Sequence, residues 1–88
     1  MSKQVIVYTT KNCVKCKQLK TWLRRNKIAF VTKSLDDTNT MTDLVMRNIV
    51  ILSAPALETE TKFFLSDQIF LPDNSLNPDF KEIFKGEI

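Results

Sequence analysis

The sequence predicts one α/β domain over residues 1–88, in which a mixed four-stranded sheet is flanked by three helices. Two observations indicate this class. The hydrophobic pattern alternates along the chain between strand-like runs and helical spacing, in the order β-α-β-α-β-β-α. The first three elements form a strand–helix–strand unit, which implies parallel pairing through a right-handed crossover. Because 88 residues are too few for two hydrophobic cores, we expect a single domain.

The first strand–helix–strand unit is the most regular part of the chain. Residues 4–9, QVIVYT, form a β-branched and aromatic run that predicts a strand buried on both faces. From Cys13 to about Asn26, apolar residues recur at helical spacing while basic and amide side chains fill the other face. This pattern predicts an amphipathic helix. Residues 29–35 predict the second strand.

A second helix and a hairpin are expected next. After a turn rich in capping residues at 36–40, one helical face carries Met41, Leu44, Val45 and Ile49. Residues 56–59 and 62–65 then form two short apolar runs that are joined by an acidic turn. This arrangement predicts an antiparallel hairpin.

The last part of the chain carries two helix-start signals. Ser66 can cap a short helical turn that extends through Phe70. Asn77-Pro78-Asp79 is a stronger start, because it combines a capping residue, a proline at the first helical position and an early acid. We expect this helix to stop at Gly86.

Charge is divided unevenly along the chain, although the net charge is only +3. Residues 1–35 carry nine basic and no acidic side chains, whereas the remainder carries four basic and ten acidic ones. Such a segment favours either an acidic partner protein or a solvated helix face. Nucleic acid is disfavoured as a partner, because no aromatic residue alternates with these lysines to form a stacking platform.

Nothing in the sequence predicts a membrane span or a signal peptide. The longest apolar runs, such as residues 49–52, are far shorter than the roughly 20 residues that cross a bilayer. The N-terminal stretch MSKQVIVY lacks a small-residue cleavage site. We therefore expect a cytoplasmic protein, in which thiols are kept reduced and a lone cysteine pair serves redox chemistry or metal binding rather than structure.

Both cysteines of the chain open the first expected helix, within YTTKNCVKCK. At spacing i and i+3 their side chains lie on neighbouring turns and can form a disulfide. Cys13 faces the unpaired N–H groups and the positive end of the helix, which favour its thiolate, and nearby lysines add to this effect. Cys16 lies on the apolar stripe. We therefore expect Cys13 to be the catalytic nucleophile and Cys16 the resolving cysteine.

A metal site is the alternative use of the two thiols. A structural zinc site usually needs four nitrogen or sulfur ligands, but the chain has no histidine and no second cysteine pair. A dimer that shares thiolates around a metal ion or an iron–sulfur cluster stays open as the second hypothesis. Otherwise no cofactor is expected beyond the electron donor.

The stretch YTTKNCVKCKQLKTWLRRNKIAF, followed by the second strand, resembles the glutaredoxin-like redoxins of the thioredoxin fold. Its Cys-Val-Lys-Cys motif is closer to the Cys-Val-Gln-Cys of the NrdH-redoxins, which reduce ribonucleotide reductase, than to the Cys-Pro-Tyr-Cys of typical glutaredoxins. The resemblance is specific over Val5 to Leu35. It implies a thioredoxin fold and a monomeric thiol–disulfide oxidoreductase, whose partners are disulfide-containing proteins rather than nucleic acid or membranes.

Two departures from the family bear on the electron donor. Glutaredoxins hold glutathione partly through Gly-Gly-x-Asp after the fourth strand, where this chain has Leu65-Ser66-Asp67. The family's basic residue three positions before the first cysteine is Thr10 here, although Lys11 is adjacent. The resemblance therefore implies reduction by a thioredoxin-reductase-type flavoprotein in preference to glutathione.

The expected substrate-binding residues surround the cysteine pair. Ser53-Ala54-Pro55 stands where the family has a cis-proline, which docks the substrate segment. Ser66 and Asp67 either bind a terminal amine or carboxylate or form a simple helix cap. An aromatic residue in a strand or on an apolar helix face, such as Tyr8 or Trp22, is more often part of the core than of a groove. The full set is Tyr8, Lys11, Val14, Lys15, Ser53, Ala54, Pro55, Ser66 and Asp67.

Overall fold

The computed structural model describes residues 4–87 and contains a four-stranded mixed sheet in the order β2-β1-β3-β4. The central strand β1 (Ile6–Thr9) pairs in parallel with β2 (Val31–Ser34) and antiparallel with β3 (Ala56–Glu58). The strand β3 pairs antiparallel with β4 (Phe63–Phe64). The predicted parallel unit and the predicted hairpin are both confirmed.

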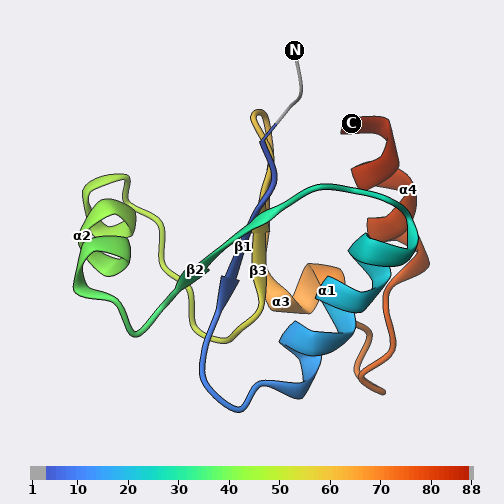
Figure 1. Ribbon diagram of the computed structural model, residues 1–88, viewed down its shortest axis with the longest axis horizontal. Helices are drawn as coiled ribbons and strands as arrows, with labels where there is room; N and C mark the ends of the chain where they lie inside the picture. The colour runs from blue at the N-terminus through green and yellow to red at the C-terminus, as the bar shows by residue number, and fades with distance from the viewer. Residues whose placement is uncertain (1–3, 88) are drawn as a thin grey trace.

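Four helices accompany the sheet in the described part of the chain: α1 (Val14–Arg25), α2 (Thr38–Met46), α3 (Ser66–Ile69) and α4 (Pro78–Glu87). The helix beyond the three of the predicted class is α3, the single turn that was expected at Ser66. Figure 1 shows α2 on one side of the sheet and the other three helices on the opposite side. The stop expected at Gly86 is wrong. The helix α4 continues through this residue, because Gly86 does not adopt the positive φ of a helix-ending glycine.

The larger hydrophobic core lies between the sheet and the three helices α1, α3 and α4. Its α1 side chains Leu19 and Leu23 are completely buried, as expected for the apolar stripe of an amphipathic helix. An aromatic cluster closes the far side, where Phe64 meets Phe80 edge to face at 5.1 Å and Phe80 stacks on Phe84 at 5.6 Å. This core fixes α1, and therefore the cysteines at its start, against the sheet.

The smaller core lies under α2. Its fully packed members are Tyr8, Leu44 and Ala56. Met41 and Val45 share the helical spacing of Leu44, but their side chains are 40% and 65% exposed, whereas Leu44 is buried. The sheet covers only a narrow strip of α2, so the other apolar side chains of this helix face solvent.

No helix within residues 4–87 combines the length and the hydropathy that a bilayer crossing requires. Met1 to Lys3, and with them one of the nine basic residues and the start of the N-terminal stretch, lie outside the described residues. Of the side chain of Glu87 nothing is described.

Candidate redox site

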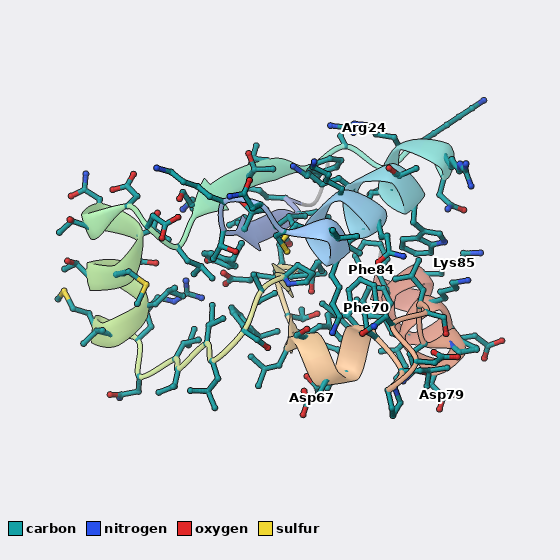
Figure 2. All side chains as sticks on the ribbon, turned by 90° about the horizontal axis from the view of Figure 1, so that it is seen from below. Arg24, Asp67, Phe70, Asp79, Phe84 and Lys85 are labelled. Atoms are coloured by element: carbon teal, nitrogen blue, oxygen red, sulfur yellow. A yellow bond between two sulfur atoms is a disulfide. The ribbon has the colours of Figure 1, made fainter. Side chains whose placement is uncertain are left out.

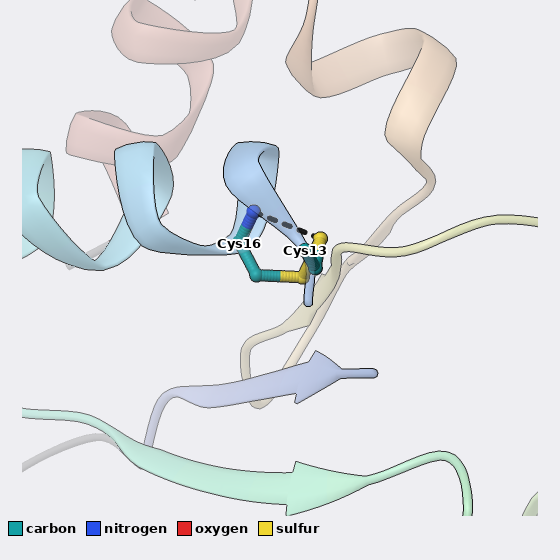
Figure 3. The surroundings of a disulfide bond; sticks show 2 residues. All are labelled: Cys13 and Cys16. Carbon is teal, nitrogen blue, oxygen red and sulfur yellow. Dashed lines mark hydrogen bonds between the residues drawn. A yellow bond between two sulfur atoms is a disulfide. The ribbon is translucent and has the colours of Figure 1, made fainter. Parts of the chain in front are cut away.

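The chain turns sharply just before α1 and leaves Cys13 at the helix start. Asn12 has a φ of 56°, in the left-handed region that asparagine tolerates better than most residues. Cys13 follows in an extended conformation as the N-cap, and its Sγ accepts a hydrogen bond from the backbone N–H of Cys16 at 3.1 Å. Figure 3 shows this bond at the start of the helix. A helix N-terminus thus points its positive end at the Cys13 sulfur.

Cys13 and Cys16 are joined by a disulfide, with their Cα atoms 5.2 Å apart. This separation lies within the range that disulfides require. Cys16 is only 2% exposed and packs on the apolar stripe of α1, whereas Cys13 is half-buried. An incoming sulfur can therefore reach Cys13 more readily than Cys16.

Three lysines surround this helix start, and the first turn of α1 contains no acidic residue. Lys11 and Lys17 are exposed, whereas Lys15 is half-buried with its Nζ 5.6 Å from the ring centroid of Phe70. Among the side chains of residues 4–86, none of these lysines forms an ion pair with a carboxylate. Their charge is therefore available to favour a thiolate over a thiol at Cys13.

Four of the predicted binding residues meet although they are distant in sequence. Lys15, Ser53, Ser66 and Asp67 line a cavity of about 240 Å³ whose wall also includes Phe70. An adjoining cavity of about 290 Å³ shares the two serines and Asp67. In Figure 2, Asp67 points outward from α3. The fold thus brings a cation, two hydroxyls and a carboxylate together beside the helix that bears the cysteines.

The α3 side of this surface is polar, and some of its hydrogen-bonding groups have no partner among the described residues. Ser66 is 6% exposed, and its hydroxyl makes no hydrogen bond to any other residue between 4 and 87. Gln68 caps the turn instead, with its Oε1 accepting from the Leu65 N–H at 2.8 Å. Apolar Val50, Leu52 and Leu65, which are 70%, 93% and 36% exposed, complete the adjoining cavity. The surface therefore combines apolar contact with unpaired polar groups.

The Ala54–Pro55 bond is cis, as the resemblance implied. Pro55 is buried and Ala54 is half-buried, directly before β3. Val14 is 71% exposed and follows Cys13 at the helix start. Neither Ala54 nor Pro55 lines the two cavities.

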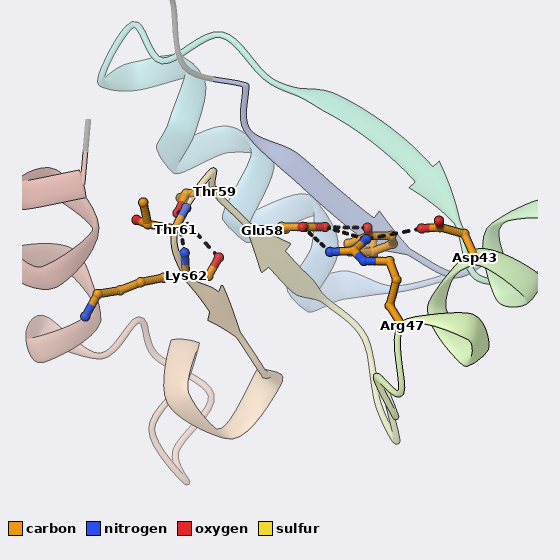
Figure 4. A network of polar contacts seen from close by, with 7 residues as sticks. Asp43, Arg47, Glu58, Thr59, Thr61 and Lys62 are labelled. Atoms are coloured by element: carbon orange, nitrogen blue, oxygen red, sulfur yellow. Dashed lines mark hydrogen bonds and ion pairs between the residues drawn. The ribbon is translucent and has the colours of Figure 1, made fainter.

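Tyr8 lies in the smaller core and not in a surface groove. Its side chain is fully buried, and its hydroxyl donates to Glu58 Oε1 at 2.7 Å. Glu58 also pairs with Arg47, which in turn donates to Asp43 at 3.1 Å (Figure 4). Burial, followed by the hydrogen bond to Glu58, raises the pKa of Tyr8 to about 12. As placed, Tyr8 offers no surface to a substrate.

Some features of the site escaped sequence reasoning. Phe70 and Asn74 help to line the cavity beside Lys15. The sequence placed Phe70 at the end of the short turn expected from Ser66 without assigning it to the site, and Asn74 lies in a segment without helical or strand periodicity. The Glu58–Arg47 pair joins a strand to the end of α2. Only the i, i+4 spacing of Asp43 and Arg47 was visible in the sequence.

The described residues contain no group of three or more histidine, cysteine, aspartate or glutamate side chains that could hold a metal ion. The two thiols alone would have to supply the protein ligands of one chain. A cluster shared between two chains therefore stays a prediction.

The glutaredoxin family model matches residues 5–63 of the chain. Among curated proteins, the chain is 31% identical over 85 residues to the global transcriptional regulator Spx 2 of Bacillus anthracis, covering 92% of this chain and 64% of that protein. The Spx 2 of Bacillus cereus is 31% identical over 77 residues, covering 83% of this chain and 58% of that protein. The chain thus spans less than two thirds of the length of these relatives.

Two solved structures share the fold. Glutaredoxin 1 from Francisella tularensis, crystallised with cacodylate, has a TM-score of 0.53 at 22% identity, covering 70% of this chain and 80% of that one. The thioredoxin-like protein BC3987 has a TM-score of 0.62 at 20% identity, covering 74% of this chain and 89% of that one. At these identities the likeness shows the thioredoxin-like fold alone.

Proposed function

The chain belongs to the glutaredoxin family, and from this membership we propose that it is a thiol–disulfide oxidoreductase that reduces protein disulfides with a dithiol mechanism. The observation that carries the proposal is the Cys13–Cys16 disulfide at the start of a basic helix, with one sulfur more accessible than the other. Because a substrate can reach one thiol more easily than the other, the two thiols suit the separate roles of nucleophile and resolving cysteine in disulfide exchange.

The reaction begins with the reduced pair. The Cys13 thiolate attacks one sulfur of the substrate disulfide, so that a mixed disulfide forms and the other substrate sulfur leaves as a thiolate. The Cys16 sulfur, after losing its proton, then attacks Cys13 Sγ. The second substrate sulfur leaves, and the Cys13–Cys16 disulfide remains. Two electrons have passed to the substrate, and a reductant returns two electrons and two protons to the pair.

The surroundings of Cys13 support its role as the nucleophile. The Cys16 N–H lies 3.1 Å from its sulfur, and Lys11, Lys15 and Lys17 place positive charge around the helix start. Both effects stabilise the Cys13 thiolate in the reduced protein, and the lysine charges also stabilise the substrate thiolate that leaves when the mixed disulfide forms. Cys16 has less access to substrate because it is 2% exposed.

We assign the cavities beside Lys15 to the substrate segment that carries the disulfide. Ser53, Ser66 and Asp67 line these cavities and offer hydrogen bonds there. Lys11 and Val14, which are exposed and flank Cys13 in the chain, are proposed to contact the substrate at the helix start. The cis Ala54–Pro55 bond lies directly before β3, and the backbone of Ala54 is proposed to pair with the substrate segment that carries the disulfide. The protein acts in the cytoplasm as a monomer, and ribonucleotide reductase is a candidate substrate because of the resemblance of the Cys-Val-Lys-Cys motif.

Substitution of each cysteine tests the roles. We expect Cys16→Ser to accumulate a mixed disulfide with a protein substrate, and Cys13→Ser to be inactive in an insulin-reduction assay. Iodoacetamide trapping of the reduced protein across a pH series should show Cys13 reacting with a pKa below the roughly 8.5 of a free thiol. Equal alkylation of both cysteines at neutral pH contradicts the assignment.

The electron donor is proposed to be a thioredoxin-reductase-type flavoprotein. Leu65 occupies the place where glutaredoxins use glycine to let glutathione approach the backbone, and its side chain adds bulk there. The oxidised protein is reduced either with NADPH and thioredoxin reductase or with glutathione and its reductase. We expect faster turnover with the flavoprotein. Rapid, saturable turnover at millimolar glutathione contradicts this choice of donor.

A regulatory thiol switch is the second candidate function. It is favoured by the identity of 31% to a global transcriptional regulator over 92% of this chain. In that role the Cys13–Cys16 disulfide changes the binding of a partner and is not turned over. A disulfide-reduction assay separates the two functions, because a switch is oxidised once per molecule whereas an oxidoreductase turns over many times with its reductant.

A further inference from the structure

A groove of about 570 Å³ runs along α1 and shares no lining residue with the cavities assigned above. Lys17, Trp22 and Arg25 line it from α1. Leu76 lines it from the segment that leads into α4, and Lys81 lines it from α4 itself. The α1 residues of the groove recur at helical spacing and so form one stripe of the helix. Figure 1 shows α1 and α4 side by side, in agreement with the ring contacts of Trp22.

The floor of the groove is apolar and held in place. The Trp22 ring lies 5.7 Å from the rings of both Phe80 and Phe84, and so it is anchored to the larger core. Leu76 pairs with Phe70 in an isolated β-bridge. The intervening turn is closed by a hydrogen bond of 2.8 Å from Leu71 N to Ser75 O. The groove is therefore preformed.

The charge of the groove is positive. Its lining includes the cations of Lys17, Arg25 and Lys81 and, within residues 4–87, no carboxylate. None of the three cations forms an ion pair with a described carboxylate, which leaves out that of Glu87. Nearby Asp73 is outside the lining, and its carboxylate accepts hydrogen bonds from Ser75. Unpaired cations above a fixed apolar floor complement carboxylates that flank an apolar side chain.

The groove is also next to the redox site. Val14, which is 71% exposed, belongs to its lining and directly follows Cys13 in the chain. A segment lying in the groove would therefore have one end beside the reactive sulfur. This position suits a partner that presents its disulfide to Cys13 while a neighbouring stretch of the same chain is held along α1.

We propose that this groove binds an acidic, extended segment of the disulfide-bearing partner protein, a proposal that rests on the proposed function and names its substrate class. Lys17 and Arg25 are eight residues apart on α1, so their Cα atoms are about 12 Å apart along the helix axis. An extended chain covers this distance in about four residues, at roughly 3.3 Å each. Side chains i, i+2 and i+4 of a strand face one way. The segment therefore carries carboxylates at i and i+4 and an apolar side chain at i+2.

Nucleic acid fits this groove less well than a peptide. Trp22 is half-buried and packs on two phenylalanine rings, so it does not present the open stacking platform that single-stranded nucleic acids use. An apolar side chain, by contrast, can contact Trp22 and Leu76 without stacking. A short oligonucleotide therefore serves as a competing probe in the test.

The test uses the oxidised wild-type protein without any reductant, so that binding is separated from redox turnover. Trp22 is the single tryptophan of the chain, and its fluorescence reports occupancy of the groove directly. The probe is a nine-residue peptide of serine and glycine with glutamate at positions 3 and 7 and leucine at position 5. We expect a saturable change in emission. Replacing both glutamates by glutamine should weaken binding about tenfold, in line with two exposed ion pairs.

Two matched double variants test whether the peptide binds in the groove. The double variant Lys17→Glu, Arg25→Glu should bind the acidic peptide about tenfold more weakly or worse, because two attractions between opposite charges become repulsions. The control, Lys33→Glu with Lys62→Glu, changes the net charge by the same amount at exposed residues outside the groove. Its peptide affinity should stay within about twofold of wild type once salt screens distant charges. The comparison of the glutamate and glutamine peptides on wild-type protein needs no variant and decides the matter if a variant fails to fold.

Three results overturn the inference: equal binding of the two peptides, equal loss in both pairs of variants, or tighter binding of a ten-nucleotide oligothymidine than of the acidic peptide. Reduction of a small neutral disulfide by the wild-type protein is measured in parallel. If that activity is present and the peptide does not bind, the groove assignment fails alone. If the peptide binds and no disulfide is reduced, the oxidoreductase proposal fails instead.

Discussion

Replacing Tyr8 by phenylalanine should lower the stability of the protein without affecting disulfide reduction. The substitution keeps the ring, which contacts Phe63 with the centroids 5.7 Å apart, and removes only the hydroxyl. That hydroxyl donates to Glu58, which retains Arg47 as a partner. The loss at neutral pH should therefore be about 1.5 kcal/mol, the lower end of the range for a hydrogen bond to a charged acceptor.

The effect has a pH dependence of known sign. Burial and the bond to Glu58 raise the pKa of Tyr8 from 10.0 to about 12, so the folded state favours the neutral phenol. The resulting stability is fully present below pH 10 and is lost as the pH rises through about 12. A shift of this size corresponds to about 2 to 3 kcal/mol, and about half of it is lost by pH 11. Wild type should therefore lose its advantage over Tyr8→Phe between pH 8 and pH 11.

Two measurements check this reasoning. Tyr8 is the single tyrosine of the chain, so absorbance of the phenolate near 295 nm titrates this group alone. The midpoint should lie near 12 in buffer and near 10 in concentrated urea. Urea unfolding of wild type and Tyr8→Phe at pH 8 and pH 11 gives the free energy of unfolding of each protein. Deprotonation of the lysines affects both proteins equally, so it cancels from the difference between them. A midpoint near 10 in the folded protein refutes the argument, and a raised KM for disulfide substrates would return Tyr8 to the substrate surface.

Three further predictions concern the cavities, the network and the charge. Asp67→Asn should raise the KM for a peptide disulfide severalfold and leave kcat unchanged, and an unaltered KM would remove Asp67 from the substrate surface. Arg47→Ala should raise the pKa of Tyr8 further, because the hydrogen bond and the charge of Arg47 lower it in the wild type, and the same absorbance titration measures this shift. Reduction of an acidic protein substrate should slow as salt screens the basic segment over about 8–10 Å, whereas reduction of a small neutral disulfide should not change. Equal salt dependence of the two substrates would rule out electrostatic steering.

The strand–helix–strand unit and the position of the cysteines could be predicted because their signals are local. β1 alternates between the two cores, with Val7 facing the larger and Tyr8 the smaller, and so its run is apolar throughout. The stripe containing Cys16, Leu19 and Leu23 is buried as helical spacing predicts. In both cases the pattern within one element already determines which side chains are covered.

The rest depends on which elements meet, and no local pattern determines that. Met41 and Val45 share a helical spacing with Leu44, but the sheet covers only a narrow strip of α2. Lys15 and Ser66 gather around one cavity only because the fold places α1 beside α3. The groove on α1 needs Leu76, which lies in a segment without periodicity. These juxtapositions arise from tertiary packing and become visible only in the structure.

The two cores stabilise the two faces of the molecule to different extents. The face that carries Cys13 rests on the aromatic cluster of Phe64, Phe80 and Phe84, which packs α1 and α4 against the sheet. The α2 face has fewer buried side chains and depends on the polar chain from Tyr8 through Glu58 to Arg47. Local opening follows the element with the fewest buried contacts. α2 should therefore open first, while the helix start that holds the disulfide stays in place, and amide exchange in α2 should outpace exchange in α1.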